Sequence, residues 1–180
     1  MKEVKIHDKK FRLFIPNERI IETVEKMAAK MNRDLTGKSP LFICILNGSF
    51  IFAAELYKRI SLMDSEISFV RLASYDGDRT TGNVRQLIGL DENIEGRTVV
   101  VVEDIVDSGI TLDHICNILN MMDPVRVLTA TLLLKPDCLK LQIWPDYVGL
   151  EIPNDFIVGY GLDYNGYGRN LSDIYSVINE

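Results

Sequence analysis

Residues 99–112 contain the feature that most constrains the fold of this chain. The stretch opens with four consecutive valines, and a β-branched apolar run of this kind is typical of a strand buried on both faces of a sheet. After three acids and a small-residue turn, apolar side chains return at helical spacing, at Leu112, Ile115, Cys116, Leu119 and Met122. The sequence therefore predicts a strand whose carboxyl end passes through a tight loop into the amino end of a helix.

The loop in this stretch has the character of an anion-binding site. Ser108, Gly109 and Thr111 are small enough for a phosphate to approach the main chain, where the free N–H groups and the positive end of the helix dipole would meet it. Glu103 and Asp104, just before the loop, would repel phosphate and each other, so a sugar's hydroxyls or a metal ion would give them a purpose. Taken alone, the segment also allows the acids to cap the helix or lie on a solvated rim.

A second junction of this type follows the apolar stretch 41–46. Asn47-Gly48-Ser49 leads from that predicted strand into a helical pattern over residues 50–60. Two such junctions could hold two phosphoryl groups. Taken alone, the tripeptide is more simply a plain turn with Ser49 as the helix N-cap.

Strands alternate with helical segments along the chain, which favours an α/β fold with a parallel sheet covered by helices on both faces. A first helix is expected from Pro16 to about residue 34. Its apolar stripe comprises Ile20, Ile21, Val24, Met27, Ala28 and Met31. Further strands are expected at 67–73, 84–90 and 125–134, and the 180 residues suit one domain.

Composition limits the partners and the location. The chain has 20 basic and 26 acidic residues, and a formal charge of -6 argues against a broad nucleic-acid footprint. Cys44, Cys116 and Cys138 are odd in number and far apart, so neither a disulfide framework nor a zinc site is expected, and all three are predicted to be buried thiols. The amino terminus is too charged for a signal peptide, and no apolar run approaches the ~20 residues that span a bilayer, so no membrane contact and a cytoplasmic location are expected.

The stretch 99–112 resembles the 5-phosphoribosyl-1-diphosphate binding motif of the type I phosphoribosyltransferase family, which consists of hydrophobic residues, two acids, two hydrophobic residues and Asp-Ser-Gly-x-Thr. Ordered matches elsewhere narrow the resemblance to the branch of the family that acts on hypoxanthine and guanine. They are Leu46-Asn47-Gly48-Ser49, Ser74-Tyr75, Lys135-Pro136, residues 156–165 and Arg169. The resemblance spans nearly the whole chain, and such ordered agreement is more specific than any one loop.

The resemblance implies the type I phosphoribosyltransferase fold, with a central, mostly parallel twisted sheet flanked by helices, a small hood and a flexible lid hairpin. Residues 1–180 would form a single domain, with the hood contributed by the N-terminal strand and by about residues 136–180. The polar stretch 74–82 would be the lid that shields a developing ribosyl cation from water, with Ser74 and Tyr75 reaching the diphosphate. Without the resemblance, that stretch is simply a mobile hairpin loop.

The resemblance also implies a Mg2+-dependent, cytoplasmic purine salvage enzyme that is a homodimer or a homotetramer. It would convert hypoxanthine or guanine and 5-phosphoribosyl-1-diphosphate to IMP or GMP and pyrophosphate. Two rival functions remain open. One is a regulator that binds the same sugar diphosphate and nucleic acid, and the other is a related transferase for another base.

Each implied role falls on particular residues of this chain. Asp107 would be the general acid/base. The ribose and its phosphate would be held by Glu103, Asp104, Ser108, Gly109, Ile110 and Thr111. Pyrophosphate would be held by Leu46, Asn47, Gly48 and Arg169, with a non-proline cis peptide between Leu46 and Asn47. The purine site would comprise Lys135, Phe156, Ile157 and Asp163. Asp163 would hold Mg2+, which Glu103 and Asp104 would reach through ribose or water.

Some of these residues also have plainer explanations. Lys135 could cap a strand in water, Phe156 could be a core aromatic and Arg169 a surface cation. Asn47 stands where the family usually has a basic residue, which removes one cation from the pyrophosphate site. His7 and His114 are expected to be solvated and to have no catalytic role.

Overall fold

The computed structural model describes residues 2–74 and 85–178 of the chain. The elements in chain order are β1 (Glu3–Ile6), β2 (Lys9–Ile15), α1 (Asn17–Asp34), β3 (Leu41–Leu46), α2 (Phe50–Tyr57), β4 (Glu66–Ser74), β5 (Arg85–Ile88), β6 (Thr98–Val106), α3 (Ile110–Asn120), β7 (Arg126–Leu134), β8 (Tyr147–Glu151), β9 (Ile157–Val158) and β10 (Ile174–Val177). A short 3-10 turn at Pro136–Cys138 follows β7. No helix among these elements is long and apolar enough to cross a membrane.

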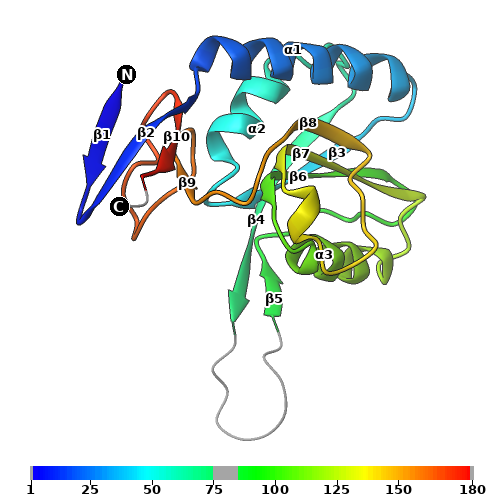
Figure 1. The fold of residues 1–180 in the computed structure, drawn as a ribbon. Helices are drawn as coiled ribbons and strands as arrows, with labels where there is room; N and C mark the ends of the chain where they lie inside the picture. The colour runs from blue at the N-terminus through cyan, green and yellow to red at the C-terminus, as the bar shows by residue number, and fades with distance from the viewer. Residues whose placement is uncertain (1, 75–84, 179–180) are drawn as a thin grey trace, which may run out of the picture.

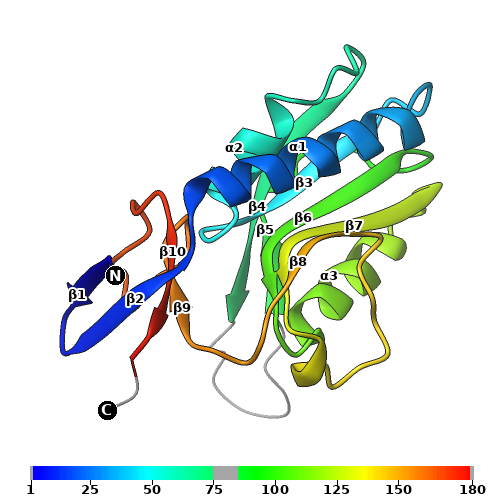
Figure 2. The same cartoon turned by 45° about the horizontal axis from the view of Figure 1, so that its top comes forward.

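The larger of two sheets has the strand order β5-β4-β3-β6-β7-β8. Five of its strands, β4, β3, β6, β7 and β8, are parallel, and β5 runs antiparallel at one edge. Helices α1 and α2 cover one face of this sheet and α3 covers the other (Figures 1 and 2). The predicted α/β class, with a mostly parallel sheet flanked by helices, is confirmed.

The valine run of β6 explains how this sheet is stabilised. Val100 and Val102 pack in the core layer formed with α1 and α2, whereas Val99 and Val101 pack in the layer formed with α3. All four are buried. Because successive side chains of a strand point to opposite faces, only a strand that is covered on both sides favours such a run.

Most predicted core positions are buried, with exceptions at the edges of elements. Ile21 is only half-buried beside the buried stripe of α1. Met122 is 40% exposed because α3 ends at Asn120. The prediction of three buried thiols is correct only for Cys44, since Cys116 on α3 and Cys138 in the 3-10 turn are half-buried.

The smaller sheet has the order β1-β2-β10-β9, and all its pairings are antiparallel. It joins the two ends of the chain, and its own core contains Phe11, Val158 and Tyr175 (Figure 1). Of the strands after residue 136, β8 belongs to the larger sheet and β9 and β10 belong to the smaller one.

The buried carboxylate of Asp173 anchors the smaller sheet to the start of α1. It accepts hydrogen bonds from Lys2 Nζ at 2.5 Å, from the backbone N–H of Asn17 at 2.9 Å and from the Tyr175 hydroxyl at 3.1 Å. These partners lie at opposite ends of the sequence. The carboxylate therefore connects the amino terminus, the first helix and the last strand.

Candidate active site

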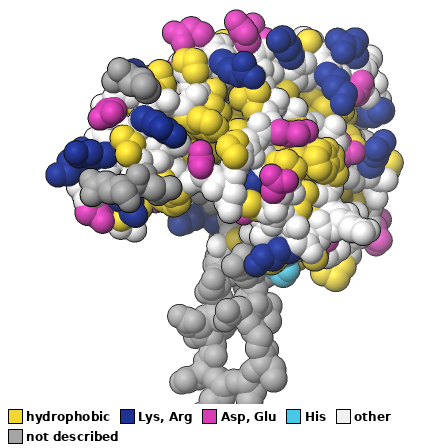
Figure 3. Space-filling model, in the orientation of Figure 1, with side chains coloured by type: hydrophobic (Ala, Val, Ile, Leu, Met, Phe, Trp, Pro, Cys, Tyr) yellow, Lys and Arg dark blue, Asp and Glu magenta, His cyan; other side chains and the backbone are white. Residues whose placement is uncertain are grey.

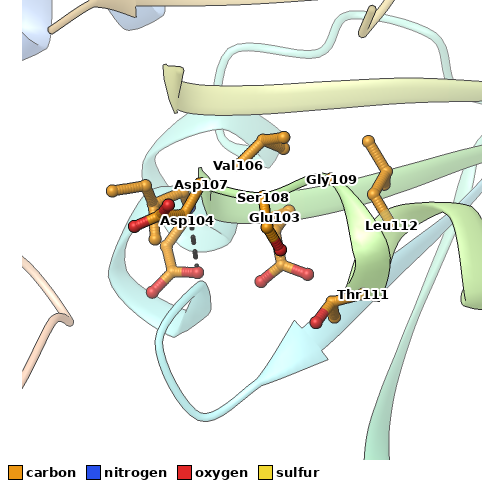
Figure 4. A pocket seen from close by; sticks show the side chains of 9 residues that line it. Glu103, Asp104, Val106, Asp107, Ser108, Gly109, Thr111 and Leu112 are labelled. Atoms are coloured by element: carbon orange, nitrogen blue, oxygen red, sulfur yellow. Dashed lines mark hydrogen bonds between the residues drawn. The ribbon is translucent and has the colours of Figure 1, made fainter. Parts of the chain in front are cut away.

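The loop between β6 and α3 forms a cavity of about 190 Å³ (Figure 4). It is lined by residues 103–109 together with Thr111 and Leu112. Gly109 precedes α3 with φ +80°, and a Cβ there would lie 2.7 Å from Ile143 Cγ2. Both the backbone conformation and the space at this position therefore require glycine.

Glu103 and Asp104, the acid pair, are both buried at the end of β6 (Figure 4). Burial, and then the neighbouring carboxylate of Asp104, raise the pKa of Glu103 well above its usual value, and burial also raises the pKa of Asp104. Asp104 Oδ1 accepts a hydrogen bond from the N–H of Ile105, whereas Glu103 Oε2 has no hydrogen-bond partner among the described residues. Buried acids with unused acceptor capacity suit a ligand that brings hydroxyl groups or a cation.

A second cavity, of about 340 Å³, shares Asp104, Ile105 and Asp107 with the first. Its lining comes from four separate segments of the chain: Gly48, Asp104, Ile105, Asp107, Lys135, Phe156, Ile157, Leu162, Asp163 and Arg169. Eight of these ten were predicted site residues, and the structure brings them together. Ile105 and Leu162 were not predicted, although each adjoins a predicted acid.

Lys135 and Asp107 form an ion pair at the carboxyl ends of β7 and β6. Lys135 Nζ lies 2.9 Å from Asp107 Oδ2, and the backbone N–H of Lys135 donates to Val106 C=O at 2.9 Å. The Lys135 side chain is only 8% exposed, whereas that of Asp107 is 53% exposed. The alternative that Lys135 caps a strand in water is therefore wrong. The pairing itself was not predicted.

Phe156 stands at the side of the second cavity nearest the smaller sheet. Its ring centroid lies 5.7 Å from that of Tyr164 and 6.3 Å from that of Phe11, and the residue is 45% exposed. One side of the ring thus packs on the smaller sheet while the residue lines the cavity. The core-aromatic alternative is wrong, and Ile157, the next residue, is the buried one.

Arg169 is held by partners on its own side of the cavity. Its Nη2 lies 2.6 Å from Asp163 Oδ1, and its Nη1 donates to Gly161 C=O at 2.6 Å. The other carboxylate oxygen of Asp163 accepts from the N–H of Gly166 at 2.7 Å. A side chain with these contacts and 28% exposure is not the free surface cation of the plainer alternative.

The turn between β3 and α2 packs against the acid pair. The cis peptide bond between Leu46 and Asn47 that the resemblance implied is present. A Cβ on Gly48 would overlap the Asp104 carboxylate. Ser49 occupies the N-cap position of α2, as the alternative expected, but its hydroxyl donates to Ile45 C=O at 2.5 Å and makes no capping hydrogen bond.

Several predicted residues line neither of the two cavities. Of the described residues, those that line the cavities do not include Leu46, Asn47 or Ile110, and Ile110 is 47% exposed. Ser74 is the last residue of β4, and Tyr75 lies outside the described residues.

The donor set fits one mode of magnesium binding. The described residues contain no group of three or more His, Cys, Asp or Glu that could hold a metal ion by itself. Mg2+ is commonly bound through one or two carboxylates together with substrate phosphates. Asp104 and Asp163 line the same cavity, and Glu103, whose Oε2 has no partner among the described residues, lines the first cavity together with Asp104. The residues present therefore fit an ion that arrives with a phosphorylated substrate.

Comparison with known proteins identifies the class. The phosphoribosyl transferase domain family matches residues 15–165, and the chain belongs to the phosphoribosyltransferase family. The chain is 42% identical over 161 residues to the hypoxanthine-guanine phosphoribosyltransferase of Streptococcus agalactiae, with 89% of each chain covered. It is 34% identical over 172 residues to the enzyme of that name from Homo sapiens, with 91% of this chain and 79% of that one covered.

Solved structures agree with this assignment. A hypoxanthine-guanine phosphoribosyltransferase from Bacillus anthracis superposes with a TM-score of 0.83 at 39% identity, covering 92% of this chain and 96% of that one. A hypoxanthine phosphoribosyltransferase from Staphylococcus aureus gives 0.85 at 34% identity, covering 93% and 91%. Within the family, the chain thus belongs to the hypoxanthine-guanine phosphoribosyltransferase branch.

Proposed function

We propose that the protein transfers the phosphoribosyl group of 5-phosphoribosyl-1-diphosphate to N9 of hypoxanthine or guanine, forming IMP or GMP and releasing pyrophosphate. One observation carries the proposal. The cavity at the β6–α3 loop and the cavity that holds the Asp107–Lys135 pair share three residues, so a sugar phosphate in the first would present its C1 to a base in the second.

The acid pair suits the ribose. Ribose hydroxyls would donate hydrogen bonds to the carboxylates of Glu103 and Asp104, and the unpartnered Glu103 Oε2 supports this role. The backbone N–H groups of residues 108–111 would hold the 5′-phosphate at the amino end of α3. As the C1–O bond to the diphosphate breaks and the C1–N9 bond forms, positive charge spreads over the ribose, and the nearby carboxylates would stabilise that charge.

The Asp107–Lys135 pair suits a 6-oxopurine. Asp107 would accept the N7 proton as N9 attacks C1, and its exposed carboxylate can reach a ligand in the cavity. The Lys135 ammonium has only donors, so it favours a 6-oxo group and disfavours an exocyclic amine. Phe156 would stack on the base, while Ile157 supplies main-chain contacts to its edge.

Pyrophosphate would leave toward Arg169 and the turn formed by Leu46, Asn47 and Gly48. Bound Mg2+ would neutralise charge on this leaving group. Asp163 would hold the ion, and Glu103 and Asp104 would reach it through ribose or water. Because Asn47 brings no cation, binding at this turn would rely on main-chain N–H groups, and Arg169 would provide the positive charge.

The remaining parts of the proposal concern the whole chain. Residues 1–180 would act as a single domain, with the smaller sheet as a hood over the base and with Ser74 and Tyr75 contacting the diphosphate. The protein would work in the cytoplasm as a homodimer or homotetramer, on small-molecule substrates.

Steady-state assays test the proposed reaction directly. The protein would be incubated with Mg2+, 5-phosphoribosyl-1-diphosphate and, in turn, hypoxanthine, guanine, xanthine, adenine and orotate. Turnover of hypoxanthine or guanine is expected, and a preference for adenine or orotate would overturn the base assignment. Filter binding with RNA and DNA would detect the nucleic-acid-binding alternative. That alternative needs a basic face, whereas basic and acidic side chains are interspersed over α1 in Figure 3.

A further inference from the structure

The turn formed by residues 159–162 lies against the β3–α2 turn with no room for a side chain. Gly161 has φ +101°, and a Cβ on it would overlap the carbonyl oxygen of Gly48. Gly48 is confined from its other side, where its own Cβ would overlap the Asp104 carboxylate. Gly48 is therefore in close contact with both Asp104 and Gly161, which come from two other segments of the chain.

Two hydrogen bonds also connect Gly161 with Arg169, and each residue donates one of them. Its N–H donates to Arg169 C=O at 2.9 Å, and Arg169 Nη1 donates to Gly161 C=O at 2.6 Å. The second nitrogen of the same guanidinium pairs with Asp163. The peptide groups of Gly161 thus fix both the backbone and the guanidinium of Arg169.

The residues before Gly161 prevent the turn from moving aside. A Cβ on Gly159 would overlap Asp173 C=O, so this residue also lies directly on the neighbouring backbone. Tyr160 is 2% exposed in the core layer shared with α1 and α2, and its N–H donates to Leu171 C=O at 2.8 Å. A methyl group on Gly161 would therefore have to displace Gly48 or Arg169.

We infer that Gly161 is a positioning residue for the end of the site that binds the sugar diphosphate. This inference rests on the proposed function and refines it. Gly161 holds the Gly48 peptide and the Arg169 guanidinium in register with Asp104, so it sets the affinity for magnesium pyrophosphate and for 5-phosphoribosyl-1-diphosphate. Of the residues proposed to contact the purine, Lys135 directly follows a different strand, β7, and Phe156 packs against Phe11 and Tyr164.

Gly161→Ala tests the role against a control glycine that also has a positive φ. Gly96 has φ +70°, and an added Cβ would meet no atom within 4 Å, so Gly96→Ala introduces a positive φ for alanine without a collision. For Gly161→Ala, the KM for 5-phosphoribosyl-1-diphosphate and the Kd for magnesium pyrophosphate measured by calorimetry should rise about tenfold, as expected for local strain. The KM for hypoxanthine should stay near the wild-type value, and Gly96→Ala should change neither constant.

A double-mutant cycle tests whether Gly161 positions Arg169 or whether its substitution loosens the site in general. If Gly161 acts through Arg169, the pyrophosphate Kd of Gly161→Ala/Arg169→Gln should be close to that of Arg169→Gln alone. Additive effects would show that Gly161 does not act through Arg169. A rise of both substrate KM values by the same factor would overturn the positioning role, as would an unchanged diphosphate KM.

A further measurement uses the wild-type protein, so it remains decisive even if Gly161→Ala does not fold. In [15N]glycine-labelled protein, addition of magnesium pyrophosphate should shift the amide resonances of Gly48 and Gly161 together and leave that of Gly96 in place. A Gly161 resonance that does not move would contradict the inference. Wild-type protein that turns over no purine would refute the proposed function, whereas normal turnover with an unaffected Gly161→Ala variant would refute the positioning role alone.

Discussion

At the scale of single residues, the reacting groups proposed for the base lie within hydrogen-bonding distance of each other. Lys135 Nζ and Asp107 Oδ2 are 2.9 Å apart, and the lysine is the buried partner. A buried ammonium needs a nearby negative charge, so Asp107 stabilises Lys135 before any base arrives. A purine that contacts both side chains would replace part of the ion pair between them.

Asp107→Asn should lower turnover by about 10²- to 10⁴-fold, because the amide cannot accept the proton from the purine. Binding of 5-phosphoribosyl-1-diphosphate, measured by calorimetry, should be retained because the acid pair and the 108–111 turn remain. The exposed Asp91 offers a control, and Asp91→Asn should behave as wild type. Near-normal turnover of Asp107→Asn would remove this residue from the proposed mechanism.

Phe156→Ala should raise the KM for hypoxanthine while leaving the diphosphate KM in place, since stacking contributes ~1–3 kcal/mol per base. Tyr167 is a matched control, being an exposed aromatic of the same region that does not line the second cavity. Tyr167→Ala should have no such effect. If both variants shift the hypoxanthine KM equally, the base does not stack on Phe156.

At the scale of elements, the chain was most predictable where both faces of a strand are covered. Strands β3 and β7 were expected within one residue of their observed bounds, and the valine run located β6, because uninterrupted apolar runs leave few alternatives. Strands β8 and β10 were not predicted. They are short and border turns, and β10 is stabilised by partners about 160 residues away in the sequence.

The site was also only partly predictable from the sequence. Motifs that are contiguous in sequence located the acid pair, the 108–111 turn and Lys135. The Lys135–Asp107 and Arg169–Asp163 pairs and the stacking of Gly161 on Gly48 were not predicted. Contacts of this kind depend on how separate elements pack, and residue spacing along one chain carries little information about that packing.

Tyr160→Phe should stabilise the protein. The Tyr160 hydroxyl is buried and has no hydrogen-bond partner among the described residues, and an unsatisfied polar group costs about 1–3 kcal/mol. A gain of ~1 kcal/mol would raise Tm by about 2–4 °C in a protein of this size. Scanning calorimetry provides the measurement.

Tyr57→Phe is the matched control, because it also removes a tyrosine hydroxyl, but one that has hydrogen-bond partners. The Tyr57 hydroxyl donates to Ser65 C=O at 3.0 Å and accepts from the Ser65 hydroxyl at 3.2 Å, so its removal should lower Tm. A lower Tm for Tyr160→Phe as well would mean that its hydroxyl is satisfied in solution.

At the scale of the whole molecule, Asp173 couples the ends of the chain to the main body and makes stability depend on pH. The hydrogen bond from Lys2, followed by those from Asn17 N–H and the Tyr175 hydroxyl, lowers the pKa of Asp173 below its usual value. A carboxyl group whose folded pKa is depressed stabilises the native state above the unfolded pKa of about 4, and this contribution is lost as pH falls through the folded pKa.

Asp173→Asn should therefore lower Tm at pH 7 and flatten the dependence of Tm on pH in the acid range, below about pH 4. Tm would be measured from pH 7 down to the onset of acid unfolding. Glu95→Gln, which alters an exposed acid, serves as the control and should retain the wild-type slope. An unchanged slope in Asp173→Asn would show that other carboxyl groups govern acid unfolding.

The position of β6 within the larger sheet has a consequence for how substrates enter and leave. This strand is paired with β3 on one side and with β7 on the other, and its side chains, apart from that of the half-buried Ile105, are buried. Amide hydrogens in such a strand exchange with solvent only when the whole domain unfolds, whereas those of the less covered segments exchange through local opening. Deuterium uptake should therefore be slowest along the strand that carries Glu103 and Asp104. Motion that accompanies the passage of ligands is therefore expected in the surrounding segments and not along the strand that carries the acid pair.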